Sequence, residues 1–301
     1  MSITRRLKKG LKDPALFVLY LNSKKLLNWM SDEAFIKLLY KCRFGCDLNL
    51  DNPRTFNEKI QFLKLKGFKD EYTDLVDKIS VRKIVSERIG EKYLVPIVGG
   101  PWNSTSDINI SLLPEQFVFK CNHDCGSVIV CRDKNTFDFD NAFKKLDKCI
   151  KRNYYEQSRE RPYKSIKPRI FAEQFISNKD ENELVVYKFF NFNGKPRIIQ
   201  TIQGDKTEKE TIDYFDTEWK LLDLRQNFPN SKVPKSKPIH LDEMIQLSEK
   251  LSYGFPFIRV DFYDTADGVK FSEFTLYTDA GIEKFHPEKW DTILGEWIKL
   301  G

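Results

Sequence analysis

The chain has 301 residues, of which 41% are hydrophobic and 14% aromatic. This is enough apolar surface to bury a substantial core, in one large domain or in two to three lobes, so the composition excludes a disordered protein. Its longest apolar run is too short to cross a bilayer and no signal-peptide pattern opens it, so we expect a cytoplasmic protein. The six cysteines are too sparse for a disulfide scaffold. The net charge of +6 favours anionic partners, and a nucleotide, an anionic polymer or a membrane surface would each be compatible with it.

A basic segment opens the chain, and an apolar stretch follows it from about residue 15 to residue 29. The cations that precede this stretch are Arg5, Arg6, Lys8, Lys9 and Lys12. Residues 1–50 are predicted to form a helical extension that packs on its own protein. A basic, apolar segment can also lie on an anionic lipid surface, so peripheral contact with the inner face of the cell membrane through residues 1–30 is the alternative.

The middle of the chain changes from helical to strand periodicity. Apolar residues from Val81 to Ile89 recur every three or four positions, which predicts a helix that stops at Gly90. Residues 117–120 and 128–130 then predict two short strands joined by the polar loop 121–127.

Strand patterns dominate the second half of the chain. They cover residues 170–176, 185–192 and 196–203, and Asn193-Gly194 predicts a hairpin turn between the last two. A helix is expected from Leu241 to Leu251, and a hairpin of residues 257–263 and 269–276 turns at Asp267-Gly268. The predicted fold class is α+β.

The predicted strand end at Lys120 is one candidate site. The loop that follows contains Gly126 and Ser127, and small residues let backbone N–H groups approach phosphate oxygens beside a lysine charge. By itself the pattern is equally typical of an ordinary hairpin loop, because the Walker motif is absent.

A pair of carboxylates in the predicted C-terminal hairpin is a second candidate. With a simple register about Asp267-Gly268, Asp261 and Glu273 lie opposite each other, and alternation puts Phe271 on the same face as Glu273. Two adjacent carboxylates repel, and Mg²⁺ that bridges substrate phosphates would stabilise them. Neutralisation by Arg259 or a lysine is the structural alternative.

Lys188 interrupts an otherwise apolar strand, between Tyr187 and Phe189. Burial of a lysine without a partner is costly, so an edge strand that exposes the ammonium to water is the ordinary explanation.

Residues 144–169 interleave lysines and arginines with three tyrosines, a mixture that suits an anionic sugar, a phosphate or nucleic acid. We do not expect nucleic acid, because no RNA- or DNA-binding signature is present. The group Cys121, His123 and Cys125 departs from the usual zinc spacing, so a zinc site is not expected either.

Taken together, these pieces resemble the ATP-grasp superfamily, and more closely its TupA-like branch, which is associated with teichuronopeptide and other cell-surface polysaccharide biosynthesis. The resemblance runs from about Asn52 to the C-terminus. The stretches that carry it are Thr55-Phe-Asn-Glu-Lys59, Asp77-Lys78, residues 117–123, Asn153-Tyr-Tyr155, Pro162-Tyr-Lys164, Lys167-Pro-Arg169, Tyr187-Lys-Phe-Phe190, residues 192–196 and Gly254-Phe-Pro-Phe-Ile-Arg-Val-Asp261.

The resemblance implies two α+β lobes that hold ATP between them, after an N-terminal helical extension. The implied ranges are 1–50 for the extension, 51–115 for an N-terminal α/β region, 116–180 for the central lobe and 181–301 for the C-terminal lobe. The implied nucleotide-binding residues are Lys78, Lys120, Asn122, His123, Gly126, Ser127, Lys188 and the adenine hinge Glu173, Gln174, Phe175 and Ile176.

Asp261 and Glu273 would be the Mg²⁺ ligands, with Thr275 where the superfamily often has asparagine. A threonine hydroxyl is a poorer ligand than an amide. The phosphate loop also departs from the branch, with Asp124 and Cys125 where glycine and serine are common. A negative charge beside phosphates is unfavourable unless Asp124 points away or meets metal.

The implied reaction transfers the γ-phosphoryl group of ATP to a carboxylate, and an amine then attacks the acylphosphate. Lys188 and Arg259 would act in catalysis. The second substrate, a uronic acid or sugar carrier, would meet the basic region through Arg159, Tyr163, Lys164 and Arg169.

Three other functions stay open at this point. A sugar or polyol kinase could use the same ATP site, and a non-catalytic protein could keep the fold and bind anionic glycan. A glycosyltransferase is less favoured, since no Asp-x-Asp motif is present.

Overall fold

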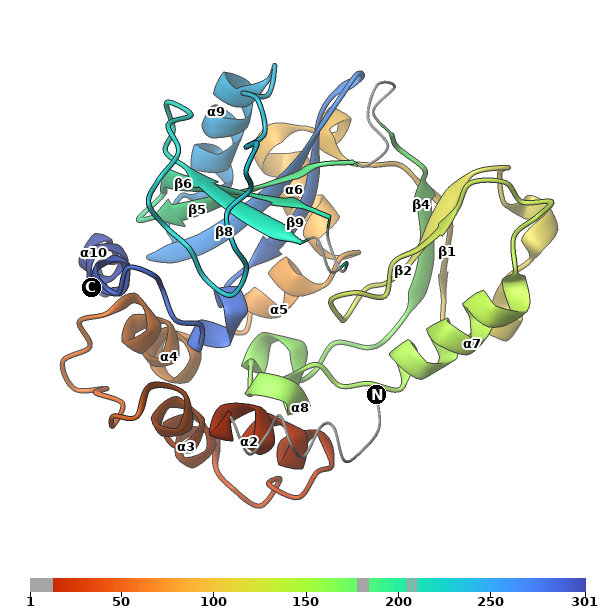
Figure 1. Ribbon diagram of the computed structural model, residues 1–301. Helices are drawn as coiled ribbons and strands as arrows, with labels where there is room; N and C mark the ends of the chain where they lie inside the picture. Colours follow the sequence, from red (N-terminus) through yellow and green to blue (C-terminus); the bar gives the residue numbers. More distant parts are fainter. Residues whose placement is uncertain (1–12, 178–183, 205–206, 208–209) are drawn as a thin grey trace.

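A computed structural model describes residues 13–177, 184–204, 207 and 210–301 (Figure 1). The basic residues expected to open a helical extension, Arg5 to Lys12, lie outside this part of the chain. The described elements are helices and two antiparallel sheets, which confirms the α+β class. Within the described residues, no helix is both long and apolar enough to span a bilayer.

The first three described helices along the chain are α2 (Pro14–Ser23), α3 (Asp32–Phe44) and α4 (Phe56–Lys66). Asp13 caps α2 through its side chain, and Ser31 caps α3. Thr55 and Glu58 form a reciprocal capping box at α4, which satisfies two backbone donors that a helix start leaves free.

Two further helices place Lys78 between them: α5 (Tyr72–Val76) and α6 (Val81–Ile89). The predicted helix over 81–89 and its stop at Gly90, which has a φ of 107°, are confirmed. In the turn that joins α5 to α6, Asp77 Oδ1 accepts from the backbone N–H of Ile79 (2.8 Å) and Ser80 (3.3 Å).

The first sheet has the order β1-β4-β2-β3. Its strands are β1 (Ile97–Trp102), β2 (Phe117–Cys121), β3 (Ile129–Cys131) and β4 (Ile170–Gln174), and helix α7 (Phe139–Ile150) packs against β2. The sequence pattern does not predict β1, because Gly99, Gly100 and Pro101 are poor strand formers. This sheet takes strands from both the 51–115 and 116–180 ranges.

The second sheet has the order β7-β6-β5-β8-β9. Its strands are β5 (Val186–Phe192), β6 (Lys195–Gln203), β7 (Thr211–Phe215), β8 (Phe257–Thr265) and β9 (Gly268–Thr275). The predicted hairpins at Asn193-Gly194 and Asp267-Gly268 are confirmed. The edge-strand explanation for Lys188 is wrong, because β5 is the central strand.

The helices of the second half are α9 (Leu241–Ser252), which packs on β5, β6 and β8, and α10 (Lys289–Trp297), which packs on α4. The short helices are α8 (Tyr155–Ser158), η1 (Glu91–Tyr93), η2 (Thr105–Asp107), η3 (Ile110–Leu112), η4 (Arg161–Tyr163) and η5 (Thr278–Gly281).

Each sheet has a hydrophobic core of its own. The largest cluster joins the second sheet to α4, α5, α6 and α9, whereas a separate cluster fills the space between the first sheet and α7. A third cluster lies between α2 and α3. Since α7 and α9 cover the outer faces of the two sheets (Figure 1), the inner faces are free to line a polar site.

Candidate functional site

A cavity of about 420 Å³ lies between the two sheets. The first sheet lines it with Val118, Lys120 and Glu173, and the second with Lys188 and Asp261. Ten residues implied by the resemblance line it: Lys78, Lys120, Gly126, Glu173, Gln174, Phe175, Ile176, Lys188, Asp261 and Glu273. Segments nearly 200 residues apart in sequence thus meet at one place.

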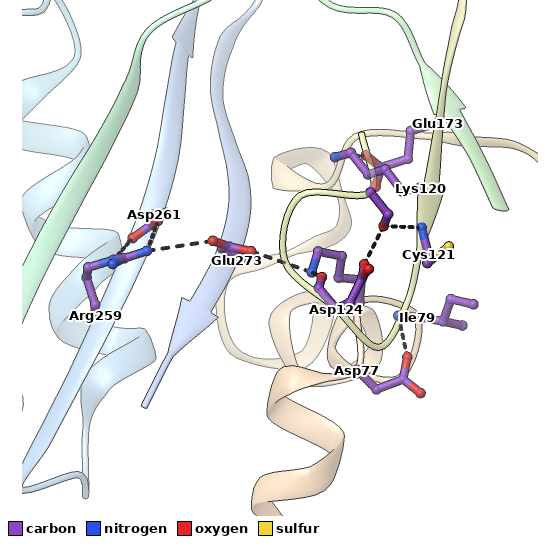
Figure 2. A network of polar contacts seen from close by, with 11 residues as sticks. Asp77, Ile79, Lys120, Cys121, Asp124, Glu173, Arg259, Asp261 and Glu273 are labelled. Carbon is purple, nitrogen blue, oxygen red and sulfur yellow. Dashed lines mark hydrogen bonds and ion pairs between the residues drawn. The ribbon is translucent and has the colours of Figure 1, made fainter. Parts of the chain in front are cut away.

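The two carboxylates of the β8–β9 hairpin face each other, as the simple register predicted: Asp261 pairs with Glu273. Arg259 Nε and Nη2 donate to the two oxygens of Asp261 (2.8 Å each), and Nη2 lies 3.6 Å from Glu273 Oε1. Figure 2 shows this guanidinium between the two carboxylates. Arg259 is buried behind them and does not line the cavity.

The expected position of Phe271 on the same face as Glu273 is wrong. A register shift follows the Asp261–Glu273 pair, so Phe262 pairs with Phe271 and Ser272 is the extra residue. Phe271 therefore packs in the core against Phe274, with ring centroids 5.0 Å apart. The bulge lets Ser272 and Glu273 both reach the cavity, a re-aiming of side chains that bulges commonly produce near sites.

Burial and neighbouring charge act in opposite directions on these groups. Burial raises the pKa of Asp261 in spite of the Arg259 charge. Burial would also raise the pKa of Glu273, but the charges of Lys78, Arg259, Lys188 and Lys120 outweigh it and lower that pKa. Glu273 therefore stays ionised near neutral pH.

Three lysines of the cavity lie near carboxylates. Lys78 Nζ lies 3.6 Å from Glu273 Oε2 and donates to the carbonyl of Asp124 (2.6 Å). Lys120 Nζ pairs with Glu173 Oε2 at 2.5 Å. Lys188 lies opposite Asp261 in the ladder between β5 and β8. Each of these three lysines thus lies near a carboxylate.

The hinge segment after β4 lines the same cavity, but its first side chain is engaged. Glu173 pairs with Lys120 and with Arg82 Nη1 (3.4 Å), so its carboxylate has two cationic partners. The guanidinium of Arg132 lies 5.0 Å from the ring centroid of Phe175 and also lines the cavity. Sequence reasoning missed Arg82 and Arg132, and no local motif distinguishes them from other surface arginines.

The polar loop 121–127 divides between the cavity and the interior. Cys125 and Gly126 line the cavity, whereas Asn122, His123, Asp124 and Ser127 are buried away from it. Ser127 Oγ donates to Asp124 Oδ1 and accepts from the backbone N–H of Cys121 (2.9 Å). Asp124 thus points away from the cavity, which is the arrangement that a phosphate loop with an acidic residue needs.

His123 is enclosed beneath this loop. Its Nε2 lies 3.1 Å from the carbonyl of Arg152, and its Nδ1 is buried without a partner among the described residues. Burial lowers its pKa, so the imidazole is neutral at neutral pH.

Two of the residues expected to meet the second substrate have internal partners. Arg159 is buried, with its Nη2 donating to Asn22 Oδ1 (3.1 Å) and to the carbonyl of Leu27 (3.0 Å). Tyr163 is buried beside Tyr154, with ring centroids 4.6 Å apart. The Arg159 bonds join the end of α8 to the N-terminal segment around α2, and the Tyr163 contact joins η4 to the start of α8.

The other two expected acceptor residues lie apart from the cavity. Lys164 lines a separate surface cavity of about 570 Å³ with Arg161 and Asp70. Arg169 Nη2 lies 3.7 Å from Asp77 Oδ2. Thr275 pairs with Arg259 in the hairpin, and it does not line the cavity between the sheets.

The donor set fits Mg²⁺ but provides only part of its coordination. Asp261 and Glu273 supply hard carboxylate oxygens, the ligands that Mg²⁺ prefers. Within the described ranges, no group of three or more His, Cys, Asp or Glu side chains could hold a metal. A bound Mg²⁺ would therefore need oxygens from phosphate and water, which is its usual arrangement beside nucleotides.

The family described as "TupA-like ATPgrasp" matches residues 58–299. Among solved structures, the D-alanine–D-alanine ligase of Bacillus anthracis complexed with ATP is 13% identical, over 67% of this chain and 54% of that chain (TM-score 0.39). The L-amino acid ligase of Bacillus licheniformis is 12% identical, over 84% and 55% (TM-score 0.45). The chain thus spans about half the length of these structures. No curated protein sequence matches.

Proposed function

Because the chain belongs to the TupA-like ATP-grasp family, we propose that it is an ATP- and Mg²⁺-dependent carboxylate–amine ligase with its nucleotide in the cavity between the two sheets. The observation that carries this proposal is the single cavity lined by Lys78, Lys120 and Lys188 together with Asp261 and Glu273. Three cations complement a triphosphate, and two facing carboxylates complement the Mg²⁺ that accompanies it.

The proposed reaction has two steps. An oxygen of the acceptor carboxylate attacks the γ-phosphorus, ADP leaves, and an acylphosphate forms. The amine nitrogen then attacks the acyl carbon, phosphate leaves with the C–O electron pair, and the nitrogen loses a proton. Neither step needs a protein nucleophile, so the chain contributes position and charge.

Each charged residue has a place in this scheme. Lys78 and Lys120 hold phosphate oxygens, and Lys188 neutralises charge on the transferred phosphoryl group. When bound at Asp261 and Glu273, Mg²⁺ supplies charge neutralisation on the phosphates. The resemblance implies a direct catalytic role for Arg259, but its guanidinium lies behind the carboxylates, so its part in this scheme is to hold Asp261 and Glu273 in position.

The acceptor we propose is a uronic-acid-containing cell-surface polysaccharide or its precursor, and the amine is an amino acid or a simple amine. The resemblance to the TupA-like branch supports this choice. The exposed Lys164 lines the second cavity and offers a contact for an anionic sugar. Arg161 lines it too, but it is half-buried and its Nε donates to Asp32 Oδ2 (3.0 Å).

Calorimetry with Mg·ATP tests the nucleotide site. We expect wild type to bind, and Lys120→Met to bind about thirtyfold more weakly, because a charge-assisted contact is lost and Glu173 keeps only Arg82. Lys134→Met is the control, since Lys134 Nζ donates to the carbonyl of Leu113, away from the cavity. A wild-type protein that binds no nucleotide would refute the proposal.

The products then separate the candidate reactions. With candidate uronic acids and amines, a ligase releases ADP and inorganic phosphate together with an amide. ADP with a phosphorylated hydroxyl would identify a sugar or polyol kinase instead. Binding of anionic glycan without any ATP turnover would identify a non-catalytic protein.

We also propose that the N-terminal helices contact an anionic membrane surface. Helix α2 is apolar on both its inner and its outer face, and Leu16, Phe17, Leu26 and Trp29 are exposed, Trp29 by 80%. The sequence before α2 has five cations and no acidic residue through position 12, which complements anionic lipid.

Vesicle sedimentation tests this contact. We expect the full chain to sediment with phosphatidylglycerol-containing vesicles and not with phosphatidylcholine alone. Trp29→Ser should reduce sedimentation, whereas Ile239→Ser, at an even more exposed apolar position before α9, should not. Equal behaviour on both kinds of vesicle, or a dimer in solution that hides Trp29, would contradict the proposal.

A further inference from the structure

The turn before α6 and the loop after β2 are joined by a pair of hydrogen bonds. The backbone N–H of Lys78 donates to the carbonyl of Asn122 (3.0 Å), and the side-chain amide of Asn122 donates to Asp77 Oδ2 (2.9 Å). Asn122 is thus bonded to both Asp77 and Lys78, which are adjacent in sequence. Two such bonds fix both the separation and the orientation of the two segments, whereas a single bond would leave them free to rotate.

Both ends of this link are themselves anchored. Asp77 Oδ1 accepts from two backbone N–H groups of its own turn. Asn122 Nδ2 also donates to the carbonyl of Lys167 (3.2 Å), and Asn122 Oδ1 accepts from the backbone N–H of Arg169 (2.7 Å). The amide has no free donor left, so Asn122 has no group to offer a nucleotide.

The link lies between the main-chain positions of two lysines that line the cavity. Lys78 directly follows Asp77, and Lys120 precedes Asn122 by two residues. Figure 2 shows Asp77 and the loop beneath Lys120 together at one end of the site. Asn122 is fully buried, and Asp77 is nearly so.

We propose that Asn122 and Asp77 are positioning residues that set the spacing between Lys78 and Lys120, a proposal that rests on the nucleotide site proposed above. Two cations bind a triphosphate best when their spacing is fixed before the ligand arrives, because no ordering is then needed at binding. The role of Asn122 is thus indirect, through Lys78, rather than the direct nucleotide contact that the resemblance implies.

A double-mutant cycle with Mg·AMPPNP tests this role. Asn122→Ala should weaken binding about tenfold in the wild-type background. In a Lys78→Met background the same substitution should change affinity less than about twofold, because there is no second cation left to position. Affinities are measured by calorimetry well below the unfolding temperature of the least stable variant.

Asn57→Ala is the matched control for lost stability. Asn57 is buried, and its Nδ2 donates to a carboxylate and to a backbone carbonyl, Asp291 Oδ1 and Glu283 O (3.0 Å each), as that of Asn122 does. Its loss should lower the melting temperature without changing nucleotide affinity. If Asn122→Ala fails to fold, Asn122→Asp keeps the volume but turns a donor toward Asp77 into an acceptor, and it enters the same cycle.

The outcomes separate this proposal from the one it rests on. An Asn122 effect that is the same size in both backgrounds, or an equal loss of affinity in Asn57→Ala, would overturn the positioning role while leaving the nucleotide site intact. A wild-type protein that binds no nucleotide would instead refute the site itself, and the positioning role with it.

Discussion

Lys78 and Lys120 at the cavity can be compared with Lys64 on α4, because all three side chains are largely buried. The pKa values of Lys78 and Lys120 are raised, whereas that of Lys64 is lowered. Burial acts to lower the pKa of each ammonium. At Lys78 the charge of Glu273 outweighs burial, and at Lys120 the neighbouring Tyr263 and Glu173 side chains do, so both pKa values are raised. At Lys64 burial prevails and lowers the pKa to about 8.

The difference lies in the partners rather than in the depth of burial. Lys64 Nζ donates to the carbonyl of Ala280 (3.2 Å), and no ion pair is found for it within the described part of the chain. The cavity lysines have carboxylates within 4 Å. These neighbours therefore keep the Lys78 and Lys120 ammonium groups protonated, the form that can bind a phosphate oxygen.

Glu273→Gln should have the largest effect on this difference between the lysines. It leaves Lys78, like Lys64, without a carboxylate within ion-pair distance among the described residues. We expect the affinity for Mg·ATP to fall about a hundredfold, or about 3 kcal/mol, since the facing carboxylates lose one of the two proposed Mg²⁺ ligands. Calorimetry with and without EDTA measures the effect, and the Mg²⁺ dependence of binding should disappear.

Asp264→Asn is the control for Glu273→Gln. Asp264 lies on the same hairpin and pairs with His240 Nδ1 (2.6 Å), but it does not line the cavity. Its loss should leave nucleotide affinity unchanged. A persistent Mg²⁺ dependence in Glu273→Gln would exclude Glu273 as a ligand.

Lys64→Met should change how the free energy of unfolding depends on pH. The unfolded chain keeps the Lys64 proton to about pH 10.4, whereas the folded protein releases it near pH 8. Between these values the unfolded state binds more protons, so the wild-type free energy of unfolding should rise with pH relative to that of the variant. The rise is about 3 kcal/mol over the full window.

Urea unfolding of both proteins at a series of pH values from 7 to 10 measures this difference. The subtraction removes cysteines and tyrosines that titrate in both proteins. Lys37→Met is the control, because Lys37 is exposed and pairs with Glu33 on the helix surface. Parallel pH profiles for wild type and Lys64→Met would show that Lys64 does not release its proton in the folded state.

Local patterns were sufficient for the parts of the site that short turns determine. The Asp261–Glu273 pair follows from strand alternation about a two-residue turn, and the α6 boundary at Gly90 follows from periodicity and a glycine stop. The bulge at Ser272 could not be predicted. It depends on Phe271 packing in the core, which is a tertiary contact.

Contacts between segments that are distant in sequence could not be predicted from local patterns. The edge-strand explanation for Lys188 failed because β5 pairs with β8, about 70 residues away, and no local signal gives the order of strands. The Glu173 carboxylate meets Lys120 and Arg82 through the meeting of β4, β2 and α6. The four proposed ranges along the chain and the individual roles of the site residues remain predictions.

Gly126→Ala should have the smallest effect and separates the loop over the cavity from an ordinary turn. Gly126 and Gly268 have nearly equal φ values, 94° and 95°, and an added Cβ would meet nothing within 4 Å at either. Alanine should therefore cost about 1 kcal/mol of stability at both. Only Gly126 lines the cavity, so only Gly126→Ala should weaken Mg·ATP binding, by about fivefold, as backbone N–H groups move away from phosphate. Equal affinities in calorimetry would mean that the loop does not close over the phosphates.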